Sequence, residues 1–142
     1  MTGQLIFAAS EQCADLMYLS GFRAPDAFLW FRVDGKSFMA VWAMEAERAR
    51  LEAHADIRIL NRETLKQDLG MTGEPLTPEE LANHHLAIEL ISSHFGVDAW
   101  EVPSDFPFGL ASQLSAHGLK LIPRKTFCPE RAIKSREEIN WL

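Results

Sequence analysis

The sequence predicts an α/β domain in which helices flank a mixed β-sheet. Short runs of apolar, aromatic and β-branched residues alternate with segments of high helix propensity, which is the pattern of an α/β fold. An Asp-Gly pair at positions 34 and 35 separates two of the strand-like runs and is a strong signal for a tight hairpin. The strands after this early hairpin alternate with helices, so we expect parallel and antiparallel pairing in one sheet.

The first half of the chain contains the hairpin and the elements around it. The apolar run QLIFAA is followed by Ser10, a good N-cap residue, and by EQCADLMYLS, whose apolar residues suit one helix face. The segments AFLWFRV and SFMAVWA flank the Asp-Gly turn, and EAERARLEAHA then has high helix propensity before the alternating run DIRIL. We therefore expect strands at 4–9, 27–33, 37–43 and 56–60, and helices at 11–20 and 45–55.

The longest predicted helix has the clearest boundary signals. Thr77 is its N-cap, Pro78 and Glu80 occupy positions N1 and N3, and Gly96 ends it. The residues that share one face of this helix are Leu81, His84, Ile88, Ile91 and Phe95. Beyond it we expect a strand at 98–102, a helix at 108–118 and a final strand at 119–123.

The C-terminal residues predict the start of a further helix. Ser135 and Glu138 have the spacing of a capping box, so a helix should begin near Arg136. Few residues follow, whereas an isolated helix shorter than about 12–15 residues is marginal in water. We therefore expect a domain over 1–134, with 135–142 as the start of a linker helix into a catalytic domain absent from this chain.

The composition is that of an ordinary globular domain and excludes several classes of function. The net charge of −6 argues against nucleic acid or a membrane surface as partner, because phosphate binding needs clustered Lys and Arg. No apolar run approaches the ~20 residues of a spanning helix, and the N-terminus has no signal-peptide pattern. Cys13 and Cys128 are too dispersed for a disulfide framework or a thiolate metal site. We expect two free thiols and a cytoplasmic location.

The sequence contains none of the common catalytic motifs considered below. His84, His85 and Glu89 fall on the long helix, but the spacing is not the H-E-x-x-H of zinc peptidases. We therefore interpret His84 as a hydrogen-bonded core or interface side chain and predict no metal site in the chain. There is no G-x-S-x-G elbow and no glycine-rich phosphate loop. We predict no catalytic residues.

One loop has the composition of a binding segment. The stretch YLSGFRAPDAFLWF places Arg23 and Asp26 between a predicted helix end and a strand. Loops at strand ends are where α/β folds place binding residues. Arg23 and Asp26 are therefore the candidates for contact with a ligand or a neighbouring domain, and the alternative is a turn cap and a solvated cation.

The same region resembles a known family. ADLMYLSGF followed by DAFLWFRVDGKSFMAVWAMEAERAR resembles the N-terminal domain of the creatinase, prolidase and aminopeptidase P family, with Ser20 where that family often has Thr. The segment RAIKSREEI resembles the junction at which that domain meets the catalytic one. The resemblance implies a mixed sheet flanked by helices, with a ribonuclease H-like motif.

The resemblance also implies how function is divided. The parent protein would be an Xaa-Pro peptidase, and its missing C-terminal domain would hold two divalent metal ions, Mn, Co or Zn. This chain would bind no catalytic metal and be inactive alone, while contributing to a homo-oligomer and to the cleft for proline-containing peptides. Its partner would be its own catalytic domain. The residues implied for the cleft or an interdomain contact are Tyr18, Arg23 and Asp26.

The sequence leaves three other interpretations open. The first is an inactive, standalone protein-interaction module of the same fold, and the second is the N-terminal domain of a creatinase-type amidinohydrolase. The last alternative is an unrelated α/β domain that binds a small molecule, which predicts a deep pocket near a switch point of the sheet.

Overall fold

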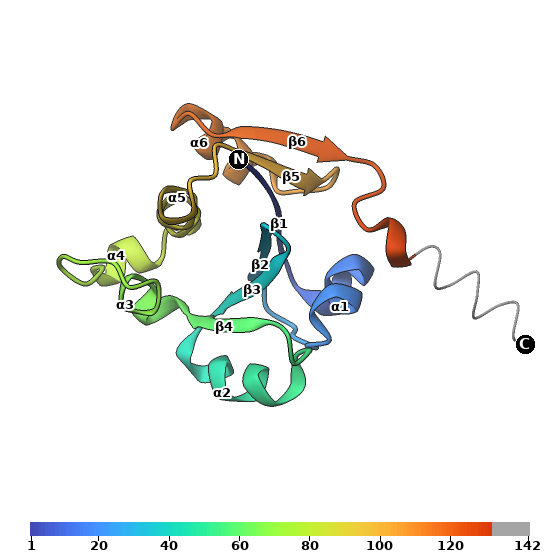
Figure 1. Cartoon of the computed structure of the whole chain (residues 1–142), viewed down its shortest axis with the longest axis horizontal. Helices are drawn as coiled ribbons and strands as arrows, with labels where there is room; N and C mark the ends of the chain where they lie inside the picture. The colour runs from blue at the N-terminus through green and yellow to red at the C-terminus, as the bar shows by residue number, and fades with distance from the viewer. Residues whose placement is uncertain (132–142) are drawn as a thin grey trace, which may run out of the picture.

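A computed structural model describes residues 1–131 of the chain. These residues form a single mixed β-sheet with helices on both faces (Figure 1). The described strands run in the order β4-β3-β2-β1-β5-β6. They are β1 (Thr2–Ala8), β2 (Phe28–Val33), β3 (Lys36–Val41), β4 (Arg58–Asn61), β5 (Ala99–Pro103) and β6 (Lys120–Arg124). The helices are α1 (Ala14–Ser20), α2 (Ala43–Glu52), α3 (Leu65–Asp68), α4 (Pro78–Leu81), α5 (His84–Phe95) and α6 (Phe108–Ala116).

Both kinds of strand pairing occur, which confirms the predicted fold class. β2 pairs antiparallel with β1 and β3, whereas the pairs β3 with β4, β1 with β5, and β5 with β6 are parallel. The hairpin between β2 and β3 turns at Asp34 and Gly35, whose φ angles are 54° and 77°. Positive φ at both central residues is what a type I′ turn requires, and Asp-Gly supplies it at low cost.

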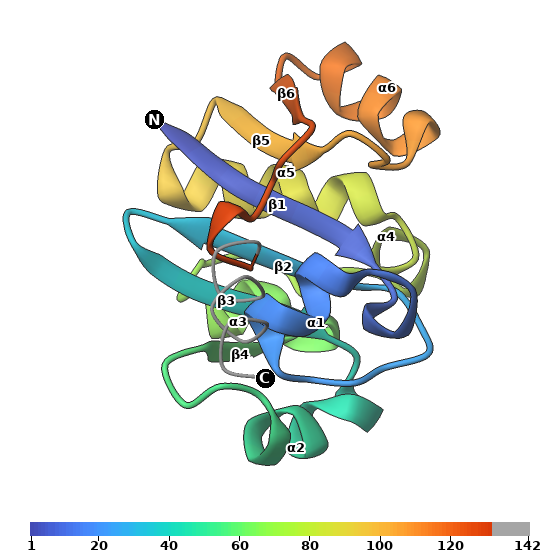
Figure 2. The same cartoon turned by 90° about the vertical axis from the view of Figure 1, so that its right-hand side faces the viewer.

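The sheet is buried on both faces because its strands alternate between two apolar clusters. Figure 2 shows α1 in front of the central strands and α5 behind them. On β2, Leu29 and Phe31 face one cluster, and Phe28 and Trp30 face the other, as the period of two demands. The first cluster is covered by α3, α5 and α6, and the second by α1, α2 and the segment around Phe127. This arrangement explains why the central strands read as continuous apolar runs.

The predicted long helix is wrong as one element, because the chain breaks it in two. Thr77 and Glu80 form the predicted capping box, but α4 ends at Leu81, and α5 begins after Asn83, whose backbone is extended. The Leu81 carbonyl instead accepts a hydrogen bond of 3.0 Å from the guanidinium of Arg62. The Arg62 side chain thus supplies a hydrogen-bond partner for a carbonyl at the break. The other end of α5 is as predicted, with Gly96 as its C-cap in the left-handed conformation.

The remaining strands and helices can be compared with their predicted bounds. The strands and the helix α6 lie within a few residues of their predicted bounds, and the short α3 is an element that the sequence did not indicate. Cys13 and Cys128 are free thiols. No helix among residues 1–131 is long and apolar enough to cross a membrane. The predicted cap at Ser135 and helix at 135–142 lie outside the described residues.

Candidate functional site

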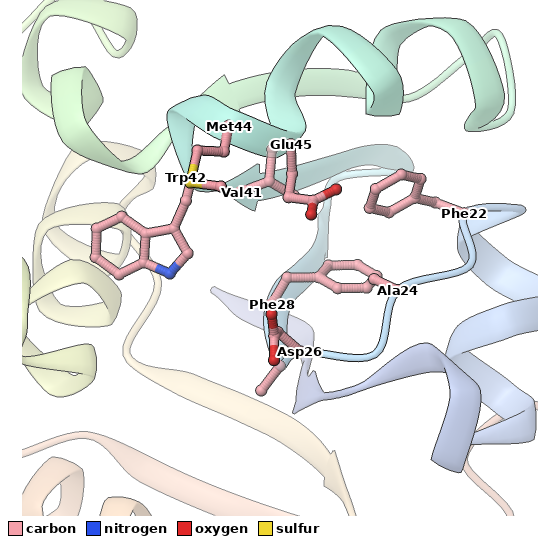
Figure 3. Close-up of a pocket in the computed structure, with 9 residues that line it drawn as sticks. Phe22, Ala24, Asp26, Phe28, Val41, Trp42, Met44 and Glu45 are labelled. Atoms are coloured by element: carbon pink, nitrogen blue, oxygen red, sulfur yellow. The ribbon is translucent and has the colours of Figure 1, made fainter.

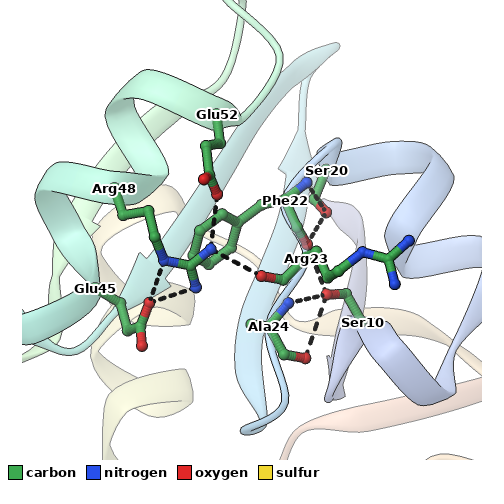
Figure 4. Close-up of polar contacts among 8 residues, drawn as sticks. All are labelled: Ser10, Ser20, Phe22, Arg23, Ala24, Glu45, Arg48 and Glu52. Carbon is green, nitrogen blue, oxygen red and sulfur yellow. Dashed lines mark hydrogen bonds and ion pairs between the residues drawn. The ribbon is translucent and has the colours of Figure 1, made fainter.

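The loop between α1 and β2 is held in place by buried hydroxyl groups (Figure 4). Gly21 ends α1 in the left-handed conformation, and Phe22 and Ala24 then point into the core. The buried Ser10 hydroxyl donates to the Phe22 carbonyl at 2.6 Å and accepts from the Ala24 N–H at 2.7 Å. Ser20 accepts from the Phe22 N–H at 3.1 Å. These bonds fix the backbone of the loop. The Arg23 side chain, which lies between the buried Phe22 and Ala24, is exposed.

Ser10 therefore has a different role from the predicted one. The N-cap of α1 is Cys13, whose side chain makes no capping bond, and residues Ser10–Gln12 form a separate 3₁₀ turn. The Ser10 side chain is used across the fold, on backbone groups of the loop. A long-range partner for a hydroxyl leaves no trace in the local sequence, which is why the capping interpretation was wrong.

Arg48 of α2 holds the other side of the loop. Its guanidinium lies 4.3 Å from the centre of the Phe22 ring and donates to the Arg23 carbonyl at 3.0 Å. It also pairs with Glu45 at 2.6 Å and Glu52 at 2.7 Å, and the hydrogen bond to Glu45 is the largest cause of a raised pKa for Arg48. Figure 4 shows the Arg23 side chain pointing away from this group. The loop is thus pinned on one side from the 3₁₀ turn that follows β1 and on the other side from α2.

Between the loop and the start of α2 lies a small apolar pocket of about 140 Å³ (Figure 3). Its wall is mostly aromatic and aliphatic, and two carboxylates stand beside it. The labelled lining residues are Phe22, Ala24, Asp26, Phe28, Val41, Trp42, Met44 and Glu45. Asp26 and Met44 are exposed, and Met44 retains 92% of its accessible surface. An apolar group with an adjacent positive charge is the ligand chemistry that this lining favours.

The three residues predicted for the site do not line one hollow. Asp26 lines the apolar pocket and also a second hollow beside Pro103 and Asp105, where β1 and β5 end. Arg23 lies over the 3₁₀ turn. Tyr18 of α1 lines a different hollow together with His54, and the Tyr18 carbonyl contacts a ring nitrogen of His54 at 3.0 Å. Of the three, Asp26 alone is placed beside the pocket.

The structure adds a group that the sequence did not suggest, at the carboxyl ends of β3 and β4. Arg62 is 3% exposed, lies 4.5 Å from the Trp42 ring and contacts His84 Nδ1 at 2.7 Å. Burial lowers the pKa of Arg62 to about 10, and burial together with the Arg62 charge lowers the pKa of His84. His84 is thus a hydrogen-bonded, half-buried side chain, as predicted. The partners come from three separate segments, so no local pattern could have indicated the group.

Potential metal ligands lie together at a different place in the fold, between α5 and the end of α6. Within residues 1–131 one group has the donor types for a metal ion, namely His85, Glu89 and His117. It lies on α5 and at the end of α6, on the face of the sheet opposite to α1 and α2. It is therefore separate from the apolar pocket.

No family model and no curated protein matches the chain, but its fold is known from solved structures. An X-Pro aminopeptidase from Thermotoga maritima superposes with a TM-score of 0.62 at 12% identity, covering 87% of this chain and 31% of that one. An Xaa-Pro aminopeptidase structure from Streptococcus thermophilus gives 0.63 at 13% identity, over 90% and 82% of the two chains. The prolidase from Pyrococcus furiosus gives 0.54 at 9%, over 84% and 29%.

The chain has the fold of the prolidase and aminopeptidase P N-terminal domain. The resemblance seen in the sequence is thereby confirmed at the level of the fold. The chain spans about a third of the Thermotoga protein and less of the Pyrococcus prolidase.

Proposed function

We propose that this chain is the non-catalytic N-terminal domain of an Xaa-Pro dipeptidase or aminopeptidase. The observation that carries the proposal is the shared fold, which covers 87% of this chain but 31% of an X-Pro aminopeptidase. The resemblance of DLMYLSGF to the family pattern supports it, since this segment forms α1 and enters the pinned loop. The two metal ions and the hydrolytic residues would then belong to a separate domain, and this chain alone would hydrolyse nothing.

In this proposal the α1–β2 loop contributes to the substrate cleft or to the contact with the catalytic domain. A peptide substrate has a cationic amino group and an apolar proline ring, and both suit the apolar pocket with Asp26 beside it. The loop backbone is fixed by Ser10 and Arg48, so Asp26 is presented at low entropic cost. Tyr18 and Arg23 face other hollows and would serve as contacts to a neighbouring domain.

The outer face of α2 supports a role in oligomerisation. Met44 and Leu51 are seven residues apart on this helix, so they lie on one face, and they are 92% and 82% exposed. Exposed apolar pairs on one helix face are typical of protein contacts. A double variant, Met44→Lys with Leu51→Lys, should lower the mass measured by light scattering at equal concentration. Phe108→Ser is the control. Phe108 is 85% exposed, similar to Met44 and Leu51, and it lies on α6, on the opposite face of the sheet from α2.

The test of the activity is Mn²⁺- or Co²⁺-dependent hydrolysis of an Xaa-Pro dipeptide and of a longer Xaa-Pro peptide. The chain itself is compared with any longer product of the same reading frame. Activity in the longer protein alone is the expected result. A folded longer protein that cleaves neither peptide would overturn the proposal.

Variants of the loop test the cleft within that active protein. Asp26→Asn should raise KM for the peptides about 3- to 10-fold with little change in kcat, because it removes a binding contact away from the reacting atoms. Glu47→Gln, an exposed carboxylate of α2, is the matched control. Equal kinetics for both variants would remove Asp26 from the cleft.

A standalone interaction module is the second candidate, and the exposed Met44 and Leu51 favour it. A reading frame that stops at Leu142 would decide for this module, whereas self-association through α2 is expected from both proposals. A cytoplasmic setting is part of either proposal and is supported by the two free thiols.

A further inference from the structure

Three side chains with metal-binding chemistry converge where α5 passes the end of α6. His85 and Glu89 lie one turn apart on α5, so their side chains share one side of the helix. His117 follows the last turn of α6 as its C-cap residue. Glu89 Oε2 lies 2.9 Å from His85 Nδ1, and Glu89 Oε1 lies 2.9 Å from His117 Nδ1. We call these three residues the His-Glu-His cluster.

The spacing within this cluster suits a single ion. One donor atom from each residue lies within 4.8 Å of the others. In a tetrahedral zinc site with bonds of ~2.0–2.1 Å, neighbouring donor atoms are roughly 3.3 Å apart. Each imidazole Nδ1 lies 2.9 Å from one of the two Glu89 oxygens, which is a hydrogen-bond distance, so a bound ion would replace both contacts. The two imidazole rings stack with their centroids 5.4 Å apart, and both would turn to direct Nδ1 at one ion. Each neutral imidazole would present the Nδ1 lone pair to the ion and keep its one proton on Nε2.

The cluster is held on a rigid base and remains open to solvent. Ile88 and Ile91 of α5 pack in the same core as Leu110 and Leu114 of α6, which fixes the two helices relative to the sheet. The side chains of His85 and Glu89 are 16% and 23% exposed, whereas that of His117 is 53% exposed. An ion can therefore enter past His117. The neighbouring His84 contacts Arg62 instead, so it does not belong to the cluster.

The donor set indicates the class of metal. Two imidazoles and one carboxylate suit Zn²⁺, Co²⁺ or Ni²⁺, whereas Ca²⁺ and Mg²⁺ prefer all-oxygen sites. With three protein ligands, the fourth position is left to water. We propose that His85, Glu89 and His117 bind one divalent transition-metal ion, best Zn²⁺, which ties the end of α6 to α5. This site is independent of the proposed peptidase function and of any metal in a catalytic domain.

Cobalt is the probe, because tetrahedral Co²⁺ has a strong visible absorption that octahedral aqueous Co²⁺ lacks. The tag-free chain is titrated with Co²⁺ and then with competing Zn²⁺, and the melting temperature is measured with and without Zn²⁺. We expect one ion per chain, displacement of Co²⁺ by Zn²⁺, and a higher melting temperature with Zn²⁺, since a ligand that binds the folded state stabilises it.

Variants identify the ligands. His117→Ala should weaken binding by at least about tenfold, the minimum usually lost even from outer-shell changes, and should remove the zinc-dependent shift in melting temperature. His94→Ala, which changes an exposed histidine near the end of α5, should leave both the affinity and the shift in melting temperature unchanged. Because His117 is exposed, its variant should fold normally, which circular dichroism checks. Octahedral Co²⁺ alone, or equal binding by the His117 and His94 variants, would overturn the proposal.

Discussion

Replacement of Ser10 tests whether this residue caps a helix or pins the α1–β2 loop. In Ser10→Ala the Ala24 N–H loses its 2.7 Å partner, and the Phe22 carbonyl keeps only a longer contact of 3.4 Å with the Ser20 hydroxyl. Leaving a buried donor or acceptor unpaired costs about 1–3 kcal/mol. With one group fully and one partly unpaired, we expect the free energy of unfolding to fall by about 2–4 kcal/mol.

Ser10→Asp separates the two roles more sharply. Asp is as good an N-cap as Ser, so a capping role predicts almost no change. The pinning role needs one donor and one acceptor, and a carboxylate cannot donate to the Phe22 carbonyl at 2.6 Å. We therefore expect Ser10→Asp to be destabilised at least as much as Ser10→Ala.

Urea denaturation followed by tryptophan fluorescence measures both variants. Ser115→Ala, which changes an exposed serine of α6, is the control and should stay near the wild type. If Ser10→Asp unfolds at the wild-type urea concentration, the reasoning about the loop is refuted.

Three further perturbations test other parts of the fold. Ser92→Ala removes the hydroxyl that accepts from Trp100 Nε1 at 2.8 Å, so unfolding in urea should be easier by about 1–3 kcal/mol, whereas the exposed Ser93→Ala should change little. Gly3→Ala places a Cβ 2.5 Å from a Trp100 ring carbon and should cost about 1–3 kcal/mol in the same assay; Gly109→Ala in α6 meets no atom and should instead stabilise. The pKa of His84 is lowered by burial and by Arg62, so the folded chain binds this proton less readily than the unfolded one, and stability should fall as the pH drops below about 6.5. His84→Gln should flatten that fall between about pH 7.5 and about pH 5.5, and an unchanged pH dependence would contradict the assignment.

The parts of the fold that local sequence determines were predictable. The Asp34-Gly35 hairpin follows from the two positive φ angles that this pair adopts readily, and the end of α5 follows from Gly96. The break after Leu81 did not follow, because the group that takes its carbonyl, Arg62, lies on a different segment. The cap at Thr77 and the glycine at position 96 indicate one continuous helix, whereas the carbonyl left at the break accepts from a side chain of another segment.

The candidate site shows the same division. The loop around Asp26 could be singled out because its residue types and its position between a helix and a strand are local properties, and its contact with a ligand stays a prediction. The buried Arg62 with His84, and His117 beside His85 and Glu89, were not found, because chain topology brings them together. Two of the three residues of the His-Glu-His cluster were visible as a helical spacing, but the third comes from the end of the next helix.

The place of β1 in the sheet has a consequence for the order of assembly during synthesis. β1 precedes the other described strands in the chain, yet it lies inside the sheet, with Thr2 paired to Ala99 of β5. Strands β1 to β4 can associate as a four-stranded unit before β5 has been made, but one edge of β1 then stays open. An open edge is a template for pairing with other chains, so the nascent domain passes through an aggregation-prone stage that ends only when β5 docks.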